Sequence, residues 1–382
     1  MSKPGVYRWE RWTTGSKMLA SIACTLILSS APSWVAAQDH PRFVPLDTDT
    51  TALGISGDGS IVVGDYYSPN NPTPGGFYWR ADTGTVPIGG NSVGGISADG
   101  TTIIGNANDE MGVQNAAIWQ GDQDWQLLGS FTPDAAPCDN LLSSAYGVSG
   151  DGSEIVGLSR NGCVYAHGFH WDAGTGMTDL GALAPPRSSR ANAISGDGTA
   201  IVGWSDRTTG FRQGAQWIDG AWQWLSSDYG PVGEALGVNA SGSMIVGYNC
   251  GPLGQWAWSW TAENGVQCIN GPVPEPYQTY MSAVSDDGSV IGGAVRPEFG
   301  PATEAVLWLY FEPVDLQQYL LANGVSEVQS WTLSWVSAVS ADGSVVAGTG
   351  IGPDLRIHGF VVYLPLDSLH ELQQAARSTR PN

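Results

Sequence analysis

One short pattern, written seven times along the chain, limits the possible folds more than any other feature of this sequence. Its copies are ALGISGDGSIVVG (from residue 52), VGGISADGTTIIG (93), AYGVSGDGSEIVG (145), ANAISGDGTAIVG (191), ALGVNASGSMIVG (235), MSAVSDDGSVIGG (281) and VSAVSADGSVVAG (336). The turn glycine recurs at intervals of 41 to 55 residues. Repeats with a period of about 40 to 50 residues include the blades of β-propellers.

Each copy predicts a unit of four β-strands. The first strand is an alternating apolar run that leads to a turn containing Asp-Gly, a strong hairpin signal. The second strand is a β-branched run such as Ser60–Gly64, which is expected to pair antiparallel with the first. After a variable loop, a third strand ends in an aromatic residue, as at Trp79 and Trp171, and a short turn leads to a fourth strand. The 52 glycines and the charged content of only 13% also favour short strands over long helices.

The two ends of the repeated region indicate how the fold closes. The seventh unit has no clear fourth strand after Tyr363, whereas an extra strand is expected at 42–47, before the first unit. We expect this stretch to complete the last blade, because a closed ring removes exposed sheet edges. The sequence therefore predicts an all-β fold, a seven-bladed β-propeller of four-stranded repeats closed by its N-terminal strand. A helix is expected within 315–324, where Asp315 can cap its start.

The chain is expected to have three segments. Residues 1–37 are predicted to be a secretory signal peptide, because basic residues precede an apolar run at 18–28 and small residues lie at 35–37. Residues 38–366 are predicted to form the propeller, and 367–382 a C-terminal helical tail. The apolar run is too short for a permanent membrane span. We expect an exported protein, extracellular, cell-surface or periplasmic, without a transmembrane segment once the signal is removed.

The combined pattern resembles the HAF-repeat proteins, a family of predicted extracellular repeats named for a His-Ala-Phe stretch. That stretch occurs here as His167-Gly168-Phe169 and His358-Gly359-Phe360. The resemblance covers essentially the whole mature chain, and it implies an extracellular or cell-envelope setting but no established activity. The fifth unit departs from the pattern, because Asn239-Ala240-Ser241-Gly242 replaces Ser-Ala-Asp-Gly.

Recognition residues are expected on one face of the propeller. The long connections that differ between repeats fall on this face, here called the loop face, and the short repeated turns fall on the opposite turn face. Arginines there could bind carboxylates or acidic sugars, and aromatic rings could stack on sugars. The candidates are Arg160, Arg207, Arg212, Arg296, Arg356, Tyr66, Tyr67, Tyr165, Phe211 and Tyr248, with Arg187 and Arg190 nearby on the same face. Alternatively, the arginines pair with loop acids such as Asp65, Asp109, Asp206, Glu298 and Asp354, and the aromatic residues cover blade ends.

The cysteines and the repeated aspartates have structural interpretations. Cys24 leaves with the signal peptide, and the remaining cysteines of an exported protein predict the disulfides Cys138–Cys163 and Cys250–Cys268. The aspartate of the repeated turn occupies the same place in each hairpin, which favours turn chemistry over calcium binding. These residues are Asp58, Asp99, Asp151, Asp197, Asp287 and Asp342. No metal or cofactor motif is found.

The charge distribution narrows the choice of function. The formal net charge is -21, and both lysines lie within the first 17 residues, which argues against nucleic acid as a partner. We expect a non-enzymatic propeller, monomeric, that binds a glycan, a surface component or a surface protein. The alternative is a polysaccharide hydrolase or lyase that uses Asp65, Asp109, Glu110 and Asp206 near the axis as acid and base.

Overall fold

The computed structural model describes residues 40–68, 71–121, 124–131, 141–218, 220–269, 277–297 and 303–365, with the backbone alone at 68, 71–73 and 297. The chain divides into two units, Met1–Ala37 and Gln38–Asn382, and all the described residues belong to the second. The predicted signal peptide (1–37) and helical tail (367–382) lie outside the described residues. Within those residues, no helix is long and apolar enough to cross a membrane.

The strands form four-stranded antiparallel sheets that follow the order of the repeats, except that the Tyr248–Tyr280 pair joins the fifth and sixth repeats into one eight-stranded sheet. The first repeat forms β2 (Thr50–Ile55), β3 (Val62–Ser68), β4 (Asn71–Arg80) and β5 (Gly84–Gly89). The second forms β6 (Ser92–Ile96), β7 (Ile103–Asn108), β8 (Gln114–Trp119) and β9 (Gln126–Gly129). The third forms β10 (Ser143–Val148), β11 (Glu154–Asn161), β12 (Tyr165–Asp172) and β13 (Gly176–Asp179). The fourth forms β14 (Ser189–Ile194), β15 (Ile201–Asp206), β16 (Arg212–Ile218) and β17 (Ala221–Trp224).

The remaining repeats continue this order after a small ribbon of β18 (Ser226–Ser227) and β19 (Gly230–Pro231). The fifth forms β20 (Ala235–Val238), β21 (Met244–Cys250), β22 (Trp256–Thr261) and β23 (Gly265–Ile269). The sixth forms β24 (Tyr277–Val284), β25 (Val290–Pro297), β26 (Glu304–Leu309) and β27 (Glu312–Asp315). The seventh forms β28 (Thr332–Val339), β29 (Val345–Ile351) and β30 (Ile357–Tyr363), and β1 (Arg42–Thr48) pairs antiparallel with β30.

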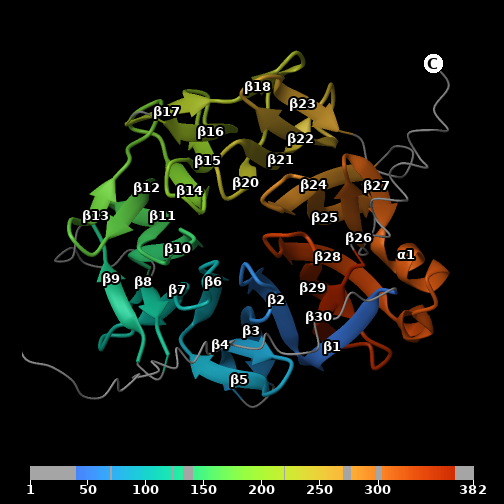
Figure 1. Cartoon of the computed structure of the whole chain (residues 1–382). Helices are drawn as coiled ribbons and strands as arrows, with labels where there is room; N and C mark the ends of the chain where they lie inside the picture. Colours follow the sequence, from blue (N-terminus) through green and yellow to red (C-terminus); the bar gives the residue numbers. More distant parts are fainter. Residues whose placement is uncertain are drawn as a thin grey trace, which may run out of the picture. The chain divides into compact units, whose positions relative to one another are not determined.

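The sheets stand around a common centre, with the first strand of each repeat innermost (Figure 1). This arrangement is that of a β-propeller. Buried apolar side chains fill the spaces between neighbouring sheets, as where Phe77 and Trp79 of β4 share a cluster with Val345 and Ala347 of β29. The core is therefore divided into wedges between sheets, and the centre is left to the innermost strands.

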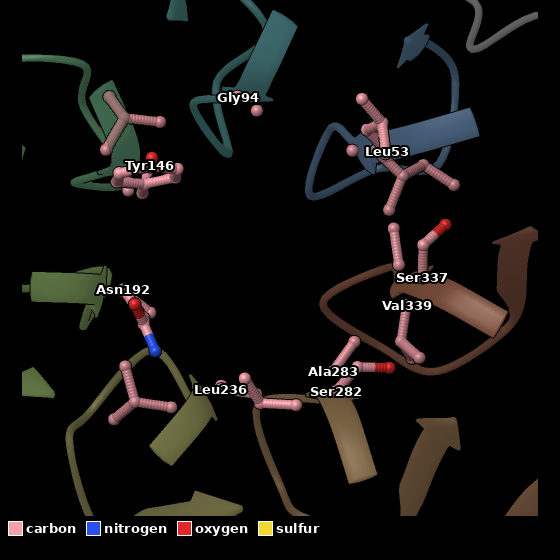
Figure 2. Close-up of a pocket in the computed structure, with 18 of the residues that line it drawn as sticks. Leu53, Gly94, Tyr146, Asn192, Leu236, Ser282, Ala283, Ser337 and Val339 are labelled. Atoms are coloured by element: carbon pink, nitrogen blue, oxygen red, sulfur yellow. The ribbon is translucent and has the colours of Figure 1, made fainter. Parts of the chain in front are cut away.

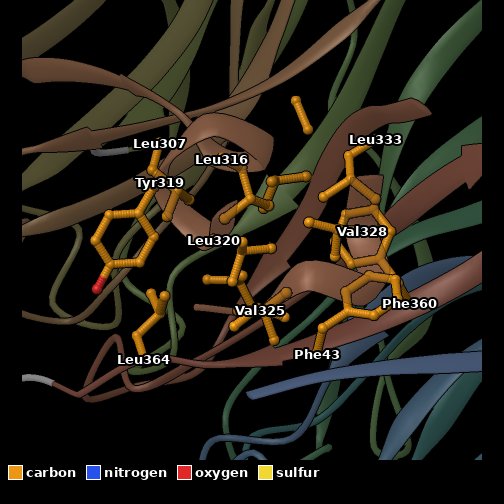
Figure 3. Packing of buried hydrophobic residues seen from close by; sticks show 14 of the residues in the cluster. Phe43, Leu307, Leu316, Tyr319, Leu320, Val325, Val328, Leu333, Phe360 and Leu364 are labelled. Carbon is orange, nitrogen blue, oxygen red and sulfur yellow. The ribbon is translucent and has the colours of Figure 1, made fainter. Parts of the chain in front are cut away.

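One helix is inserted between the sixth and seventh repeats. The helix α1 (Leu316–Ala322) begins at Asp315, whose side chain accepts a hydrogen bond from the backbone N–H of Gln318, and a short 3-10 helix, η1 (Ser326–Ser330), follows. Leu316 and Leu320 of α1 pack in the same cluster as Phe43 of β1 (Figure 3). The predicted helix is thus present, and its apolar face covers the outer part of the last sheet.

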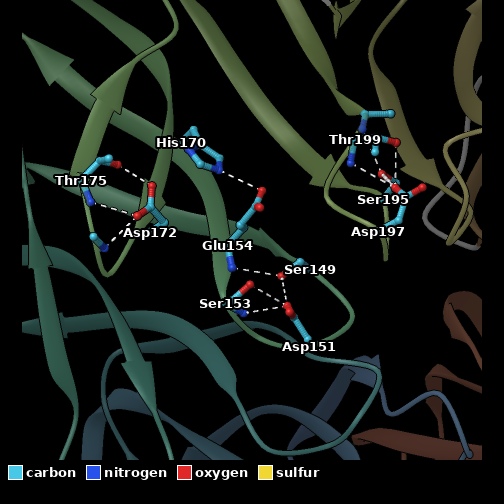
Figure 4. Close-up of polar contacts among 12 residues, drawn as sticks. Ser149, Asp151, Ser153, Glu154, His170, Asp172, Thr175, Ser195, Asp197 and Thr199 are labelled. Carbon is cyan, nitrogen blue, oxygen red and sulfur yellow. Dashed lines mark hydrogen bonds and ion pairs between the residues drawn. The ribbon is translucent and has the colours of Figure 1, made fainter. Parts of the chain in front are cut away.

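The repeated Ser-x-Asp-Gly turn is held by its own side chains. In the third repeat, Asp151 Oδ1 accepts hydrogen bonds from Ser149 Oγ (2.8 Å), Ser153 N (3.0 Å) and Ser153 Oγ (2.7 Å) (Figure 4). Ser149 Oγ in turn accepts from Glu154 N at 2.9 Å, and Gly152 has a φ of 74°. The carboxylates of Asp58, Asp99, Asp197, Asp287 and Asp342 accept the equivalent bonds.

Neighbouring turns are also hydrogen-bonded to one another, and in each link the acceptor is the backbone oxygen of the second residue of the turn. Gly57 N donates to Ala98 O (2.8 Å), and Ala341 N donates to Gly57 O (2.9 Å). The other links are Asp99 N to Gly150 O, Gly150 N to Gly196 O, Asp197 N to Ala240 O, Asn239 Nδ2 to Asp286 O and Asp286 N to Ala341 O. A Cβ on Gly57 would lie only 3.0 Å from Ala98 O, so glycine at this position lets the neighbouring turn approach closely.

Candidate functional site at the central channel

The innermost strands enclose a channel at the centre of the propeller. A cavity of about 300 Å³ lies in it, and every innermost strand contributes three consecutive residues to its wall, for instance Leu53–Ile55 of β2 and Tyr146–Val148 of β10 (Figure 2). The three lining residues occupy the same positions within every repeat. Differences between the repeats at these positions decide the chemistry of the wall.

A β-bulge in each innermost strand sets which side chain enters the channel. The register with the second strand shifts between Ala52 and Gly54 in β2, between Ala145 and Gly147 in β10, and at the equivalent place in every other repeat. The residue within the shift is left out of the ladder, and a bulge commonly re-aims such a side chain. These residues are Leu53, Gly94, Tyr146, Asn192, Leu236, Ser282 and Ser337, which all line the channel.

The loop-face end of the channel is asymmetric in sequence. Two facing positions differ between the repeats: the residue just before each repeat and the residue opposite it on the second strand. In the fourth to seventh repeats at least one of the two is large or charged: Arg190 and Trp204, Glu234 and Tyr248, Tyr280 and Ala294, Trp335 and Thr349. In the first three repeats they hold Thr51 and Asp65, Ser92 and Asn106, Ser144 and Leu158. Large side chains therefore gather on one side of the channel mouth.

A buried carboxylate organises this side of the mouth. The side chain of Glu234 is 6% exposed and accepts from Arg190 Nη2 at 2.8 Å and Arg212 Nη1 at 2.7 Å. Arg190 Nε also donates to Asn192 Oδ1 at 2.6 Å, which connects the cluster to the channel wall. Burying a carboxylate is costly unless it is paired, and two guanidinium groups satisfy this one. Arg190, Arg212 and Glu234 together have a formal charge of +1, and Arg212, with 54% of its side chain exposed, faces solvent close to the carboxylate of Asp206.

Aromatic rings surround these charges. The guanidinium of Arg212 lies 4.2 Å from the ring of Trp204, and that of Arg190 lies 5.6 Å from Trp204 and 4.9 Å from Tyr146. Trp204 is buried, and its Nε1 has no hydrogen-bond partner within the described part of the chain. Such cation–π contacts hold both arginines in place without neutralising them.

A row of neighbouring aromatic rings, tilted against one another, continues around the mouth. The ring centroids of Tyr248 and Tyr280 are 4.9 Å apart, and those of Tyr280 and Trp335 are 5.3 Å apart. Burial, followed by the charge of Glu234, raises the pKa of Tyr248 to about 12, so its hydroxyl stays protonated. We call the whole set the mouth arc: Tyr146, Arg190, Trp204, Arg212, Glu234, Tyr248, Tyr280 and Trp335.

The first repeats use the same positions to join neighbouring sheets. Asp65 is buried, and its Oδ1 accepts from Val93 N of the next innermost strand at 2.7 Å. Asn106 Oδ1 accepts in the same way from Ala145 N at 3.2 Å. Burial raises the pKa of Asp65 to about 6, against the lowering effect of the Val93 hydrogen bond. This side of the mouth is therefore structural.

The predicted arginines fall into different environments. Arg212 and Arg356 form ion pairs with Glu234 and Asp49, which are not among the acids that the sequence suggested. Arg160 is half-buried, and Arg207 and Arg296 have no ion pair with another described residue. The outlying Arg187 donates to the backbone oxygen of Thr208 at 2.8 Å.

The predicted aromatic residues are also divided. Tyr248 belongs to the mouth arc. Tyr66 packs against the core cluster between the first and last sheets and over Gly75, so it covers the end of a blade instead of facing a ligand. Tyr165 is half-buried opposite Asn161, whereas Tyr67 and Phe211 are exposed.

The acids of the enzymatic alternative do not meet. Asp109 accepts from Met111 N and Val113 N, both at 2.9 Å, in a hairpin turn, and Glu110 is exposed beside it. Asp206 lies near Arg212 and Glu234, and burial raises its pKa despite Arg212. In the described ranges no contact joins Asp65, Asp109, Glu110 and Asp206 to one another. The described residues also contain no group of His, Cys, Asp and Glu that could hold a metal ion.

The disulfides lie on the loop-face side of their sheets. Cys250 at the end of β21 is bonded to Cys268 of β23, with their Cα atoms 5.5 Å apart, as predicted. Cys163 is also disulfide-bonded, whereas Cys138 lies outside the described residues, so the Cys138–Cys163 pairing stays a prediction.

The mouth arc was only partly foreseen from the sequence. Tyr248, Arg190 and Arg212 were candidates as loop residues, but Tyr146, Glu234 and Trp335 were not. Glu234 and Trp335 could have been found from the position just before each repeat, where Thr51, Ser92 and Ser144 give way to charged and aromatic residues in later copies. Tyr146 lies inside its copy, at the bulge, and this signal does not reach it.

Comparison with known proteins agrees with the architecture. No protein-family model matches the chain, and no curated protein matches it in sequence. The β-propeller domain of the Trilobed protease from Pyrococcus furiosus is similar in structure, with a TM-score of 0.53, 11% identity and coverage of 83% of this chain and 95% of that one. The oligogalacturonate lyase of Vibrio parahaemolyticus also gives 0.53, with 8% identity and coverage of 85% and 97%. These likenesses show the fold alone.

Proposed function

We propose that this protein is an exported, non-enzymatic propeller of the HAF-repeat family that binds a glycan or other surface component at the loop-face mouth of its channel. The observation that carries the proposal is the mouth arc, in which neighbouring aromatic rings adjoin arginines on a single side of the mouth. Aromatic faces suit sugar rings, and a surplus guanidinium suits a carboxylate. Export is supported by the Cys250–Cys268 disulfide, because such bonds persist in oxidising compartments.

The scaffold behind this site is, in the same proposal, a closed ring of seven blades. Support comes from the pairing of β1 with β30, which gives the last three-stranded unit a fourth strand. The cluster that joins β4 to β29 and the hydrogen bond from Ala341 to Gly57 further connect the last repeat to the first. A closed ring would hold the mouth arc rigid, so that little ordering is needed when a ligand binds.

Binding to a glycan array with neutral and uronic-acid polymers tests the proposal. Uronic-acid polymers come first because the arc has a surplus positive charge, and because the name of the Vibrio neighbour specifies an acidic sugar oligomer. We expect binding without product formation. Tyr146→Ala and Trp335→Ala, at opposite ends of the arc, should each weaken binding by about tenfold or more.

Trp224→Ala is the matched control, because Trp224 is an exposed aromatic residue on the outer strand β17, away from the mouth. It should bind like the parent protein. Loss of binding in this control, or full binding by both arc variants, would refute the site. Turnover of a bound polymer would favour the hydrolase or lyase alternative instead.

A further inference from the structure

The most exposed apolar side chains of the described chain all lie at the loop face. Met111, Val164, Phe211, Leu253 and Leu355 are between 73% and 87% exposed. Each belongs to the connection between the second and third strands of a different repeat. Outside the loop face, the exposed fraction of a large apolar side chain in the described residues is at most 41%, as at Trp224 and Ile218. We call these five residues the loop tips.

The loop tips stand at nearly the same height above the ring. The second and third strands of these repeats stop pairing at nearly the same point. In the second, fourth, fifth and seventh repeats, the last pair lies three residues after the equivalent glycine of the second strand (Gly105, Gly203, Gly247 and Gly348). These last pairs are Asn108 with Gln114, Asp206 with Arg212, Cys250 with Trp256 and Ile351 with Ile357. In the third repeat the last pair falls one residue later, at Asn161 with Tyr165. Equal strand lengths in similar sheets place the five tips near a common plane.

Leu355 shows that exposure at these tips is not incidental. Four of these loops contain a turn whose last residue is in the left-handed conformation. In the second, fourth and fifth repeats that residue is a glycine: Gly112, Gly210 and Gly254. In the seventh repeat it is Leu355, with a φ of 63°. A bulky residue is disfavoured in this conformation, and an almost fully exposed leucine gains nothing from packing. Leucine therefore stands where glycine would suit this fold better.

The form of this face indicates its partner. The loop tips belong to none of the buried clusters and make no ring contacts with one another. A protein partner buries a continuous, closely packed patch, whereas a bilayer accepts separate apolar side chains at one depth. Seven arginines lie on this face, and three of them, Arg190, Arg212 and Arg356, are in ion pairs. At least seven acids lie there too: Asp49, Asp65, Asp109, Glu110, Asp206, Glu234 and Asp354. The loop face therefore carries no surplus of positive charge that would attract an anionic surface, and the apolar tips are what favour a bilayer.

We propose that the loop tips insert into the headgroup region of a lipid bilayer. Docking in this way does not require the glycan at the mouth. It would set the channel mouth toward the membrane surface. The contact is peripheral, since side chains and not a helix enter the lipid.

Flotation with lipid vesicles tests this proposal on the protein purified after export. Vesicles of phosphatidylcholine should carry the protein to the top of the gradient, and adding phosphatidylglycerol should not increase the fraction that floats, because the loop face has no surplus of positive charge. The variant Met111→Ser/Leu253→Ser/Leu355→Gly should bind at least about a hundredfold more weakly, because burying each side chain is worth about tenfold. Leu355→Gly alone should melt no lower than the parent protein, because glycine suits the turn.

The matched control is Leu127→Ser/Ile218→Ser/Trp224→Ser, which removes three exposed apolar side chains outside the loop tips. It should float like the parent protein. Failure of the parent protein to float, or equal flotation of the tip variant, would overturn the proposal. So would self-association in light scattering that the tip variant abolishes, since the tips would then bind a second copy. Glycan binding should survive in the tip variant, so the two proposals can fail separately.

Discussion

Asp65 and Asn106 occupy the same position in consecutive repeats and make the same contact, yet only one of them titrates. Both accept a hydrogen bond from the next innermost strand, at Val93 and Ala145 respectively. Because Asp65 is buried without a cation, its pKa is raised to about 6. The folded protein therefore holds this proton more tightly than the unfolded chain, and stability falls as the pH rises from about 4 to about 6.

Asp65→Asn should remove this pH dependence. The amide keeps an acceptor for Val93 N but carries no charge, as Asn106 does in the second repeat. Near neutral pH we expect the variant to be more stable by about 2 kcal/mol, and near pH 4 the gain should vanish because Asp65 is then protonated in both states. Urea unfolding at the two pH values measures this. Asp228→Asn, an exposed control, should show no gain at either pH, and a gain for Asp65→Asn that is equal at both would contradict the account.

Elements built from local signals could be predicted, and those set by strand register could not. The Asp-Gly hairpins and the helix capped by Asp315 follow from neighbouring residues, so the sequence alone places them. The bulge that turns Tyr146 into the channel depends on how two strands align, and the mouth arc depends on which sheets stand side by side. Glu234 was missed for this reason, since its partners Arg190 and Arg212 come from other strands.

The repeated turn gives a prediction at this scale. Hydrogen bonds from the Ser153 side chain and backbone, then from Ser149, lower the pKa of Asp151. A carboxylate with a lowered pKa stabilises the fold above its ordinary pKa and loses that effect as the pH falls through the folded value. Asp151→Ala should therefore destabilise the protein at neutral pH by about 1 kcal/mol, as the loss of a helix-capping side chain does.

Thermal unfolding at neutral pH and below pH 4 would measure this difference. The destabilisation should shrink in acid, where the parent protein has lost the same interaction. Asp82→Ala is the control, because Asp82 is exposed in another turn and should change stability little. An Asp151→Ala effect that stays constant with pH would mean that the charge of the carboxylate is not what holds the turn.

At the scale of the whole molecule, distant parts of the chain meet in one cluster. Phe43 of β1 contacts Trp331 and Phe360, with ring centroids 5.1 Å and 5.9 Å apart, and shares a buried cluster with α1. The sequence predicted the role of β1 because the seventh repeat lacks a strand. It did not predict that the inserted helix would pack on the same site, since nothing local relates Phe43 to Leu316.

Phe43→Ala should accordingly destabilise the entire domain and not only its end. Removing a buried phenylalanine from a packed cluster costs about 3 to 5 kcal/mol. If β1 closes the ring, all sheets should lose protection together in hydrogen exchange. Asp47→Ala, an exposed change on the same strand, should have little effect. Exchange that increased in β1 and β30 alone would indicate that the N-terminal strand is an independent attachment.

The hydrogen bonds between neighbouring Ser-x-Asp-Gly turns have a consequence for proteolysis. They lie at the turn face and use no atom of the loops on the opposite face. A protease that cuts the exposed loop around Met111 leaves both sides of the cut in their sheet, where β7 and β8 remain paired from Ile103 to Asn108. The two fragments therefore migrate as one particle under native conditions, and they separate only when the protein is denatured.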